Sequence, residues 1–376
     1  MKLLIYGDIG GSGGYVRYCK GLLSTKSIPK NTEVWFISSR AFYEKLAPLD
    51  ENIHIVTHPW IDSTNRILRY LWHLWVYPNL VKKINPDIEF YPTGVVRVYL
   101  RKALTIAACH NLLLFDEVEL KGIKDKRELK MLNSSMKTQK RSFLQSAGVI
   151  FTSAYSKKMI NREVPGIKDS TVIENGLDAQ FLSSQPRSYN VGSQINLLYV
   201  SPYYHYKHQV EVVKAVQLVR LSSSLDIRLN LFGGGVSSGA IKLKDFVASE
   251  NAGDYVTVGG NVHYKDLIKE YARTDIFIFA SSCEAFGITI LEAMGARLPI
   301  ACSDRTGLPE ILKDAGVYFN PEDPASIASA INTLITDEDL RKTVGEKAYK
   351  YALDYTWERS ANQTFNYIQK ILADEK

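Results

Sequence analysis

Short apolar runs alternate with longer, helix-like segments along the whole of this 376-residue chain. Strands that are separated by helices pair in parallel, with the helices covering the faces of the sheet. The first set of expected strands comprises residues 2–6, 33–37, 53–57, 88–91, 103–108 and 148–152. The second set comprises residues 195–200, 228–232, 256–259, 276–280, 299–301 and 316–319. The pattern predicts an α/β protein with two Rossmann-like, doubly wound parallel sheets.

A polar stretch separates the two sets of expected strands. Residues 183–188 read Ser-Ser-Gln-Pro-Arg-Ser, and the alternation of strand and helix restarts at Ile195. A chain of this length also exceeds what a single hydrophobic core usually supports. We therefore expect a first domain over residues 1–185 and a second domain over residues 190–356. A closing helix over residues 357–376 is expected to pack back on the first domain.

Composition narrows the class of protein. Hydrophobic residues make up 45% of the chain and charged residues 23%, as in an ordinary globular protein. No apolar run approaches the roughly 20 residues that cross a bilayer, and the first strand follows Met1 without a signal-peptide pattern. We therefore expect a cytoplasmic protein. Its four cysteines, at positions 19, 109, 283 and 302, form no CxxC pair, so neither a zinc site nor a disulfide framework is expected.

Charge is distributed unevenly along the chain. Residues 1–185 carry 26 Lys and Arg against 17 Asp and Glu, a net charge of +9, whereas residues 186–376 have a net charge of −3. A basic half is expected to face an anionic partner: a membrane surface, a lipid phosphate or nucleic acid. Nucleic acid is disfavoured because no recognition motif accompanies the charge. Trp72 and Trp75 lie among basic residues in a helical pattern that predicts either peripheral contact with anionic lipid or an ordinary core face.

The segment with the strongest functional signal runs from Ile276 to Gly295. An apolar strand leads into a loop with Glu284 and Gly287, and then into a helix that carries Glu292. The first amides of a helix have no partner within it and lie at the positive end of its dipole, which suits a diphosphate. An acid on each side of that diphosphate would accept hydrogen bonds from hydroxyls of a sugar and of a ribose. The alternative is that Glu292 is a surface helix residue and Glu284 an N-cap.

This segment resembles the donor-binding motif of glycosyltransferase family 4, whose members place Glu, seven intervening residues and then Glu-Ala-Met at this site. The resemblance continues into residues 297–312 and extends over almost the whole chain. It implies the GT-B fold and retaining, metal-independent transfer of a hexose from a nucleotide diphosphate sugar. It further implies that Glu284 contacts the transferred hexose and that Glu292 contacts the ribose. The phosphates would be held by the backbone of Ala285, Phe286, Gly287 and Ile288.

The second domain also offers a cation for the leaving diphosphate. Lys207 follows the first strand of that domain, and this pattern of strand, loop and lysine resembles the family's. Its charge would stabilise the departing diphosphate, unless it is an ordinary solvated lysine. The family usually has an Arg five residues earlier, where this chain has Pro202, so His205 or His208 would have to substitute in part. Further donor contacts are expected from Ser201 and Gly233, the latter otherwise a plain turn residue.

The first domain opens with a glycine-rich loop between a strand and a helix, over residues 6–17. Glycine lets backbone approach a phosphate or a sugar closely because it has no Cβ. The loop is not a GxGxxG motif, since Val16 stands where the third glycine would be, and no Lys-Ser/Thr pair follows. A dehydrogenase or P-loop ATPase is therefore disfavoured, and a plain tight turn is the alternative. By the resemblance, this loop contacts the donor through Gly10, Gly11, Gly13 and Gly14, and the acceptor through Tyr15 and Arg17.

His110 follows an expected strand and starts a His-Asn-Leu-Leu-Leu-Phe run. The run resembles the His-Asn-Leu-Leu-Pro-Phe segment of family members that build bacterial polysaccharides, with Leu114 in place of Pro. A neutral imidazole here would hydrogen-bond the donor sugar and the acceptor hydroxyl, with Asn111 as a further acceptor contact. The alternative is a structural histidine. The resemblance favours synthesis of O-antigen or lipopolysaccharide from a GDP-sugar such as GDP-mannose, with UDP-hexoses as the other candidates.

No cofactor is expected beyond the donor itself. The Asp337-Glu338-Asp339 run contains the Asp-x-Asp of metal-dependent glycosyltransferases, but it stands at a helix start, where capping explains it better. We therefore expect no metal site, and catalytic roles for His110, Lys207 and Glu284. Transfer to a glycan or lipid-linked saccharide is the favoured function. A sugar nucleotide 2-epimerase or phosphorylase on the same fold, and an inactive nucleotide-sugar-binding subunit, stay open.

Overall fold

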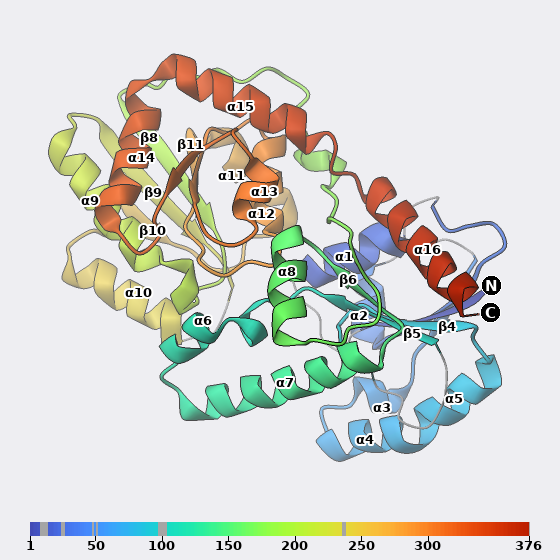
Figure 1. Cartoon of the computed structure of the whole chain (residues 1–376). Helices are drawn as coiled ribbons and strands as arrows, with labels where there is room; N and C mark the ends of the chain where they lie inside the picture. Colours follow the sequence, from blue (N-terminus) through green and yellow to red (C-terminus); the bar gives the residue numbers. More distant parts are fainter. Residues whose placement is uncertain are drawn as a thin grey trace. The chain divides into compact units, whose positions relative to one another are not determined.

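The computed structural model describes residues 1–7, 14–23, 27–46, 49, 52–96, 104–234 and 238–375. The chain divides into two compact units (Figure 1). The first unit contains Met1–Phe115, Asp125–Gly176 and Thr356–Lys376, and the second contains Asp116–Lys124 and Leu177–Tyr355. The chain thus contributes to the second unit twice, first with a short helix and then with a complete α/β domain.

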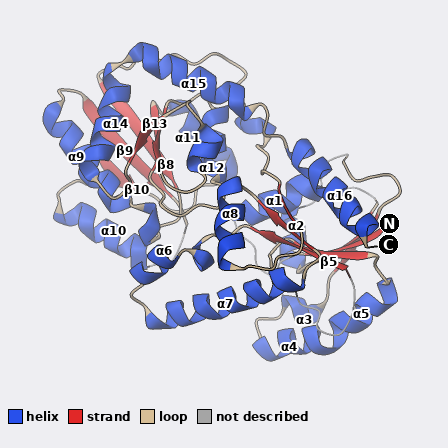
Figure 2. Ribbon diagram, viewed as in Figure 1, coloured by secondary structure: helices blue, strands red, loops and turns tan. Residues whose placement is uncertain are grey.

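A seven-stranded parallel sheet forms the centre of the first unit, with the order β3-β2-β1-β4-β5-β6-β7. Strand order reverses at β1, which is the doubly wound arrangement that the sequence predicts. The strands are β1 (Lys2–Tyr6), β2 (Glu33–Ile37), β3 (Ile53–Val56), β4 (Ile88–Tyr91), β5 (Leu104–Cys109), β6 (Gly148–Phe151) and β7 (Ser170–Val172). The middle strands are buried throughout because helices cover both faces of the sheet (Figure 2).

Helices connect the strands of the first unit. They are α1 (Gly14–Leu23), α2 (Arg40–Leu46), α3 (Pro59–Asp62), α4 (Arg66–Leu71), the π-helix η1 (Trp72–Val76), α5 (Tyr77–Ile84), the 3-10 turn η2 (Leu113–Phe115), α7 (Lys126–Gln145), α8 (Ala154–Glu163) and α16 (Trp357–Asp374). The π-helix joins α4 to α5 without a break, so the segment that contains Trp72 and Trp75 is helical, as expected. No helix among the described residues is long and apolar enough to cross a bilayer.

The C-terminal helix α16 packs on the first unit, as the sequence predicts (Figure 1). The rings of Trp357 and Tyr18 meet edge to face, with their centroids 6.3 Å apart. A Cβ at Gly21 of α1 would lie 2.1 Å from the Trp357 ring, so only glycine lets the two helices approach this closely. Phe365 and Ile368 of α16 are buried in the core of the same unit.

The second unit contains a six-stranded parallel sheet with the order β10-β9-β8-β11-β12-β13. Its strands are β8 (Gln194–Val200), β9 (Asp226–Phe232), β10 (Val256–Val258), β11 (Ile276–Phe279), β12 (Ile300–Ser303) and β13 (Val317–Phe319). Its helical segments are α6 (Glu117–Gly122), η3 (Ala179–Phe181), η4 (His205–Lys207), α9 (Gln209–Ser222), α10 (Ser238–Ser249), α11 (Tyr264–Arg273), α12 (Ile288–Gly295), α13 (Leu308–Leu312), α14 (Pro324–Thr336) and α15 (Glu338–Ala352).

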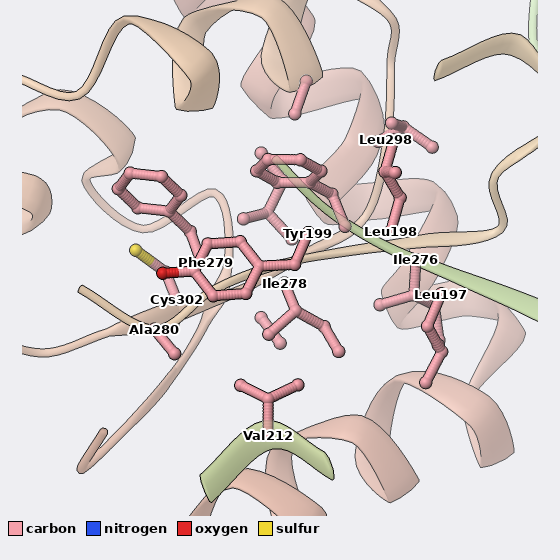
Figure 3. Close-up of a cluster of buried hydrophobic side chains, with 14 of the residues drawn as sticks. Leu197, Leu198, Tyr199, Val212, Ile276, Ile278, Phe279, Ala280, Leu298 and Cys302 are labelled. Atoms are coloured by element: carbon pink, nitrogen blue, oxygen red, sulfur yellow. The ribbon is translucent and has the colours of Figure 1, made fainter. Parts of the chain in front are cut away.

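A dense apolar core supports the central strands of the second unit (Figure 3). Leu198 and Tyr199 of β8 lie beside Ile278 and Phe279 of β11, and Val212 of α9 packs in the same cluster. The Tyr199 and Phe279 rings meet edge to face with centroids 5.8 Å apart. Each large apolar side chain buried in this way contributes about 1.5–3 kcal/mol. The ends of β8 and β11, from which the candidate site starts, are therefore held firmly.

The observed units differ from the expected domain boundaries in two places. The first unit ends at Gly176 rather than at residue 185, and α6 groups with the second unit although its neighbours Phe115 and Asp125 belong to the first. Strand β7 was not expected either. Its Ser-Thr-Val sequence is short and only partly buried, so it lacks the apolar signal on which strand prediction depends.

Candidate active site

The candidate donor site starts from the loops that follow β8, β9 and β11. Because these strands are parallel neighbours in one sheet, their carboxyl ends lie at the same edge, where α/β sheets bind ligands. Residues 201–208 follow β8, Gly233 follows β9, and residues 280–287 follow β11 and lead into α12. Most of the expected donor-binding residues are therefore brought to one edge of one sheet.

Gly287 begins α12 in a left-handed conformation, with φ 87°. No side chain in the described part of the chain caps the helix start, and a Cβ at this position would lie 3.0 Å from Leu308 Cδ2, so glycine meets both the torsional and the steric demand. Ile288 is the first helical residue and is half-buried, whereas Phe286 and Ala285 are buried. Such an uncapped start, at the positive end of the helix dipole, is suited to bind an anion.

Lys207 and Glu284 form an ion pair between the loops that follow β8 and β11. Only 7% of the Lys207 side chain and 16% of the Glu284 side chain are exposed. The Lys207 ammonium also lies 5.0 Å from the centre of the Tyr206 ring, and the Lys207 carbonyl accepts a hydrogen bond of 2.8 Å from Tyr199. The alternative of an ordinary solvated lysine is therefore wrong, because Lys207 is mostly buried. The alternative of an N-capping Glu284 is also wrong, because Gly287 occupies the N-cap position of α12.

Glu292 is buried inside α12, with 1% of its surface exposed. Tyr271 of α11 donates a hydrogen bond of 2.8 Å to its carboxylate. The alternative of a surface helix residue is therefore wrong. A buried carboxylate needs such polar partners, and its position one turn inside α12 places negative charge near the positive end of that helix.

Ser201 and Gly233 pack against each other at the ends of β8 and β9. The Ser201 hydroxyl accepts a hydrogen bond of 2.9 Å from Gln209 of α9, and a Cβ at Gly233 would lie 1.8 Å from the Ser201 carbonyl oxygen. Close backbone packing is thus a sufficient reason for glycine here. Pro202, which stands in place of the family's Arg, is exposed, and its carbonyl accepts a hydrogen bond of 2.9 Å from Gln209.

The two histidines near Pro202 are engaged elsewhere. His205 Nε2 lies 3.0 Å from the Glu119 carbonyl oxygen and 3.1 Å from the Glu119 carboxylate. His208 Nε2 lies 2.8 Å from the Ser282 hydroxyl. Burial lowers the pKa of His208, against the opposing effect of Glu211 and other acids. A neutral His208 cannot supply the missing positive charge, so the expectation that it substitutes for the family's Arg is not supported.

His110 directly follows β5 in the first unit. Burial lowers its pKa to about 4, so the imidazole is neutral near pH 7, and its buried Nε2 has no hydrogen-bond partner among the described residues. The ring meets Tyr18 edge to face at 4.4 Å and Tyr15 at 6.4 Å. Asn111 uses its side-chain oxygen to accept a hydrogen bond of 3.1 Å from the backbone N–H of Leu113, and so shapes the turn that follows.

The glycine-rich loop is only partly described. Gly10, Gly11 and Gly13 lie outside the described residues. Gly14 is the exposed first residue of α1, and Tyr15 and Arg17 follow it, both half-buried. The Tyr15 ring lies near His110 within the first unit, with ring centroids 6.4 Å apart.

Three residues of the second unit were missed by the sequence analysis: Glu119, Tyr271 and Ser282. Glu119 is separated from the Glu284 loop by more than half of the second unit's chain. Nothing in the local sequence links Glu119 to that loop. Tyr271 lies on α11 and contacts Glu292 only through the fold. Helical spacing of Tyr271 with Leu267 shows that its side chain faces the core, and a buried tyrosine needs a hydrogen-bond partner.

The Asp337-Glu338-Asp339 run is a helix cap, as expected. The Asp337 carboxylate accepts a hydrogen bond of 2.8 Å from the backbone N–H of Leu340 in α15. Across the described residues, no group of three or more His, Cys, Asp or Glu side chains is placed to hold a metal ion.

Comparison with known proteins identifies a family domain within the second unit. Residues 184–351 match the family described as Glycosyl transferases group 1. O-antigen chain mannosyltransferase B of Escherichia coli is 36% identical over 107 residues, which span only 28% of this chain and 28% of that relative. Sucrose-phosphate synthase from Thermosynechococcus elongatus superposes over 99% of both chains, with 16% identity and a TM-score of 0.74. The Anabaena protein HepE, solved with UDP and glucose, superposes over 98% of this chain and 99% of its own, with 17% identity and a TM-score of 0.72. Residues 184–351 thus form a domain of the Glycosyl transferases group 1 type, and the chain has the GT-B fold.

Proposed function

We propose that this protein is a retaining hexosyltransferase that uses a nucleotide diphosphate sugar. The observation that carries the proposal is the uncapped start of α12 beside the Lys207–Glu284 pair, inside a group 1 glycosyltransferase domain. A helix start attracts the diphosphate, a cation stabilises the leaving group, and a carboxylate accepts hydrogen bonds from sugar hydroxyls. The edge of one parallel sheet supplies all three.

The ion pair suggests how the donor would be received. Diphosphate oxygens at the start of α12 would replace Glu284 as the partner of the Lys207 ammonium. The hexose hydroxyls would replace Lys207 as the partner of the Glu284 carboxylate. Neither charge would then be left without a partner, which matters because both side chains are mostly buried. Glu292, held by Tyr271, would accept a hydrogen bond from the ribose.

Transfer would proceed by attack on the same face from which the diphosphate leaves. The bond between the anomeric carbon and the phosphate oxygen breaks, and the bond to the acceptor oxygen forms. The departing phosphate oxygen takes the proton of the acceptor hydroxyl, so no protein nucleophile is required. Neutral His110 would hydrogen-bond the donor sugar or the acceptor hydroxyl, for which its buried, unpartnered Nε2 is suited.

Lys207 would stabilise the leaving diphosphate without a metal ion. This proposal is tested by assaying transfer in the presence of excess EDTA. We expect undiminished activity. Loss of activity on chelation, with recovery on addition of manganese, would contradict the metal-independent mechanism.

The donor and acceptor are proposed from the relatives. Similarity to the O-antigen chain mannosyltransferase B favours GDP-mannose or a related GDP-sugar, and the acceptor would be a glycan or a lipid-linked saccharide in cell-surface polysaccharide synthesis. The fold shared with a protein solved with UDP and glucose makes UDP-hexoses the next candidates.

The test of the proposed function compares the thermal stabilisation of the purified protein by GDP, UDP, ADP and dTDP. The nucleotide that stabilises it is then assayed as its sugar derivative, with and without saccharide acceptors. We expect acceptor-dependent transfer with retention at the anomeric carbon. Stabilisation by none of the nucleotides would refute the proposal, and isomerisation of the donor without any acceptor would show an epimerase instead.

The first unit also presents a surface suited to anionic lipid. Four large apolar side chains of α4 and η1 are exposed: Ile67 (67%), Tyr70 (64%), Leu74 (44%) and Trp75 (58%). Their spacing places them along one side of a continuous helical segment, and Arg66, Lys82 and Lys83 are exposed on the same segment. Apolar and aromatic side chains among cations are suited to insert into an anionic bilayer surface. We propose that this face, residues 66–83, binds the membrane that carries a lipid-linked acceptor.

Vesicle flotation tests this contact. The protein should float with vesicles that contain phosphatidylglycerol and remain unbound with pure phosphatidylcholine. Trp75→Ser combined with Ile67→Ser should abolish flotation, whereas Leu221→Ser, which removes an 85% exposed leucine from the second unit, should not. Equal flotation of all three proteins would show that the face has no such role.

A further inference from the structure

We propose that Glu119 of α6 is a positioning residue that holds the loop carrying Glu284, and through it the Lys207–Glu284 pair. The inference rests on the proposed function of that pair. Glu119 comes from a short helix whose flanking residues, Phe115 and Asp125, belong to the first unit, although the helix itself groups with the second. Its contacts within the second unit assign it this role.

Glu119 is a buried carboxylate with polar partners on both oxygens. Its surface is 8% exposed, one oxygen accepts a hydrogen bond from the Ser282 hydroxyl, and the other lies 3.1 Å from His205 Nε2. Burial acts to raise the pKa of Glu119, but the hydrogen bonds from His205 and Ser282 outweigh it, so that this pKa lies below its usual value. The carboxylate is therefore ionised near pH 7 and accepts strong, charge-assisted hydrogen bonds.

Ser282 is the point at which Glu119 reaches the site. It lies two residues before Glu284, and its backbone N–H donates a hydrogen bond of 2.9 Å to the carbonyl of Tyr206. Its hydroxyl also lies 2.8 Å from His208 Nε2. Tyr206 and His208 flank Lys207, so Ser282 joins the loop of Glu284 to the loop of Lys207 from both sides.

The direction of these hydrogen bonds makes Glu119 the anchor. A serine hydroxyl has one proton to donate, and a carboxylate is a stronger acceptor than a carbonyl. With that proton directed to Glu119, the Ser282 oxygen faces His208 as an acceptor. A continuous chain of polar contacts then runs from His208 through Ser282 to Glu119 and on to His205, around the backbone of Lys207.

Helix α6 is itself fixed against this part of the second unit. Asp116 caps the helix by accepting hydrogen bonds of 3.1 Å from the N–H groups of Val118 and Glu119. Burial raises the pKa of Asp116, partly offset by hydrogen bonds that include one from the Cys283 thiol, next to Glu284 in sequence. A Cβ at Gly122 would lie 3.1 Å from the His205 ring, so the end of the helix is also tightly packed.

Loss of the Glu119 carboxylate should affect the chemical step rather than nucleotide binding. Glu119 contacts the loops of Glu284 and Lys207 through Ser282 and His205, whereas the diphosphate would bind further along the chain, at the start of α12. Without the carboxylate, the reacting geometry would loosen while nucleotide binding persists. A displacement of about 1 Å at a reacting centre costs up to about 100-fold in rate.

The test compares Glu119→Ala and Glu119→Gln with Glu117→Gln, which alters an exposed acid in the first turn of the same helix. We expect Glu119→Ala to lower kcat about 10- to 100-fold while the dissociation constants of GDP and UDP, measured by calorimetry, change less than about threefold. Glu119→Gln should recover part of kcat, because an amide oxygen still accepts from Ser282. Glu117→Gln should match the wild type.

Ser282→Ala keeps the inference testable if Glu119→Ala does not fold, because it removes the same link from the other side and should lower kcat in the same way. If Glu119→Ala does fold, the loss of kcat in the variant that combines both substitutions should be less than the product of the single losses. Wild-type kcat in a folded Glu119→Ala or Ser282→Ala variant would overturn the inference and leave the proposed function intact. Absence of nucleotide binding and of transfer in the wild type would instead refute the proposed function.

Discussion

The ammonium group of Lys207 lies against the carboxylate of Glu284, with both side chains mostly withdrawn from water. They come from loops that follow neighbouring strands, β8 and β11, and lie 77 positions apart in the chain. A pair of this kind balances two charges that would each be costly to bury alone. It also brings together the cation and the carboxylate that leaving-group stabilisation and sugar recognition require.

Replacement of Lys207 by alanine should lower turnover by at least about 100-fold. That is the scale on which one preorganised charge contact to a transition state contributes. Lys269→Ala is the matched control, because it removes a 76% exposed lysine of the same unit that pairs with Asp266. Steady-state kinetics with the identified donor measure both variants, and wild-type turnover in Lys207→Ala would contradict the assigned role.

The stability of the pair can be separated from its catalytic role. Lys207→Met alone should lower the free energy of unfolding by about 1–3 kcal/mol, because it leaves the Glu284 carboxylate mostly buried without its cation. Adding Glu284→Gln should restore most of that stability, since no unpaired charge remains. Activity should stay lost in the double variant. Urea unfolding gives the first quantity and a transfer assay the second; a double variant that regains activity would show that the pair is structural.

Glu292→Gln should weaken binding of the preferred nucleotide by about 1–3 kcal/mol, through loss of a charge-assisted hydrogen bond to ribose. The amide can still accept a hydrogen bond from Tyr271, so the variant should keep its fold. Calorimetric titration measures the affinity, with Glu250→Gln, an exposed acid at the end of α10, as the control. Unchanged affinity in Glu292→Gln would remove Glu292 from the site.

Periodicity of apolar residues was enough to predict both parallel sheets. Strands such as β6 and β11 are short, apolar and buried throughout, so their positions follow from the need to bury them. Strand β7 was missed because Ser-Thr-Val carries little apolar signal and is stabilised by pairing with β6. The membership of α6 in the second unit was not predictable, since it depends on contacts between residues far apart in the chain.

In the site, too, features of the local sequence were predictable, whereas contacts between residues far apart in the chain were not. Glu284, Gly287 and Glu292 lie in one continuous segment, so the resemblance found them together. Lys207 was placed near them by its resemblance to the family's pattern of strand, loop and lysine, in agreement with the rule that ligands bind beyond the carboxyl ends of parallel strands. Glu119 and Tyr271 reach the site through side chains whose direction only the folded chain determines, and no local pattern distinguishes them from other helical residues.

The buried imidazole of His110 should make folding stability depend on pH in a defined window. Its pKa in the folded protein is about 4, against an ordinary value of 6.5 in an unfolded chain. Between these values the unfolded chain binds a proton that the folded protein does not, so stability falls as pH decreases from about 6.5 towards 4. Above pH 6.5 the imidazole is neutral in both states, and this group contributes no pH dependence. Because one pKa unit corresponds to about 1.4 kcal/mol, the loss from this group amounts to roughly 3 kcal/mol across the window.

His110→Phe removes the titrating group and leaves an aromatic ring beside Tyr18. The difference in the free energy of unfolding between pH 7 and pH 5, measured by urea titration, should therefore be smaller by about 2 kcal/mol in this variant than in the wild type. His54→Gln, which replaces a half-exposed imidazole on β3 of the same unit, serves as the control and should retain the wild-type difference. If His110→Phe and the wild type lose stability equally between these pH values, the imidazole binds its proton equally in the folded and unfolded states. Burial would then not lower the pKa of His110, and the imidazole would not be held neutral below pH 6.5 as the proposed environment requires.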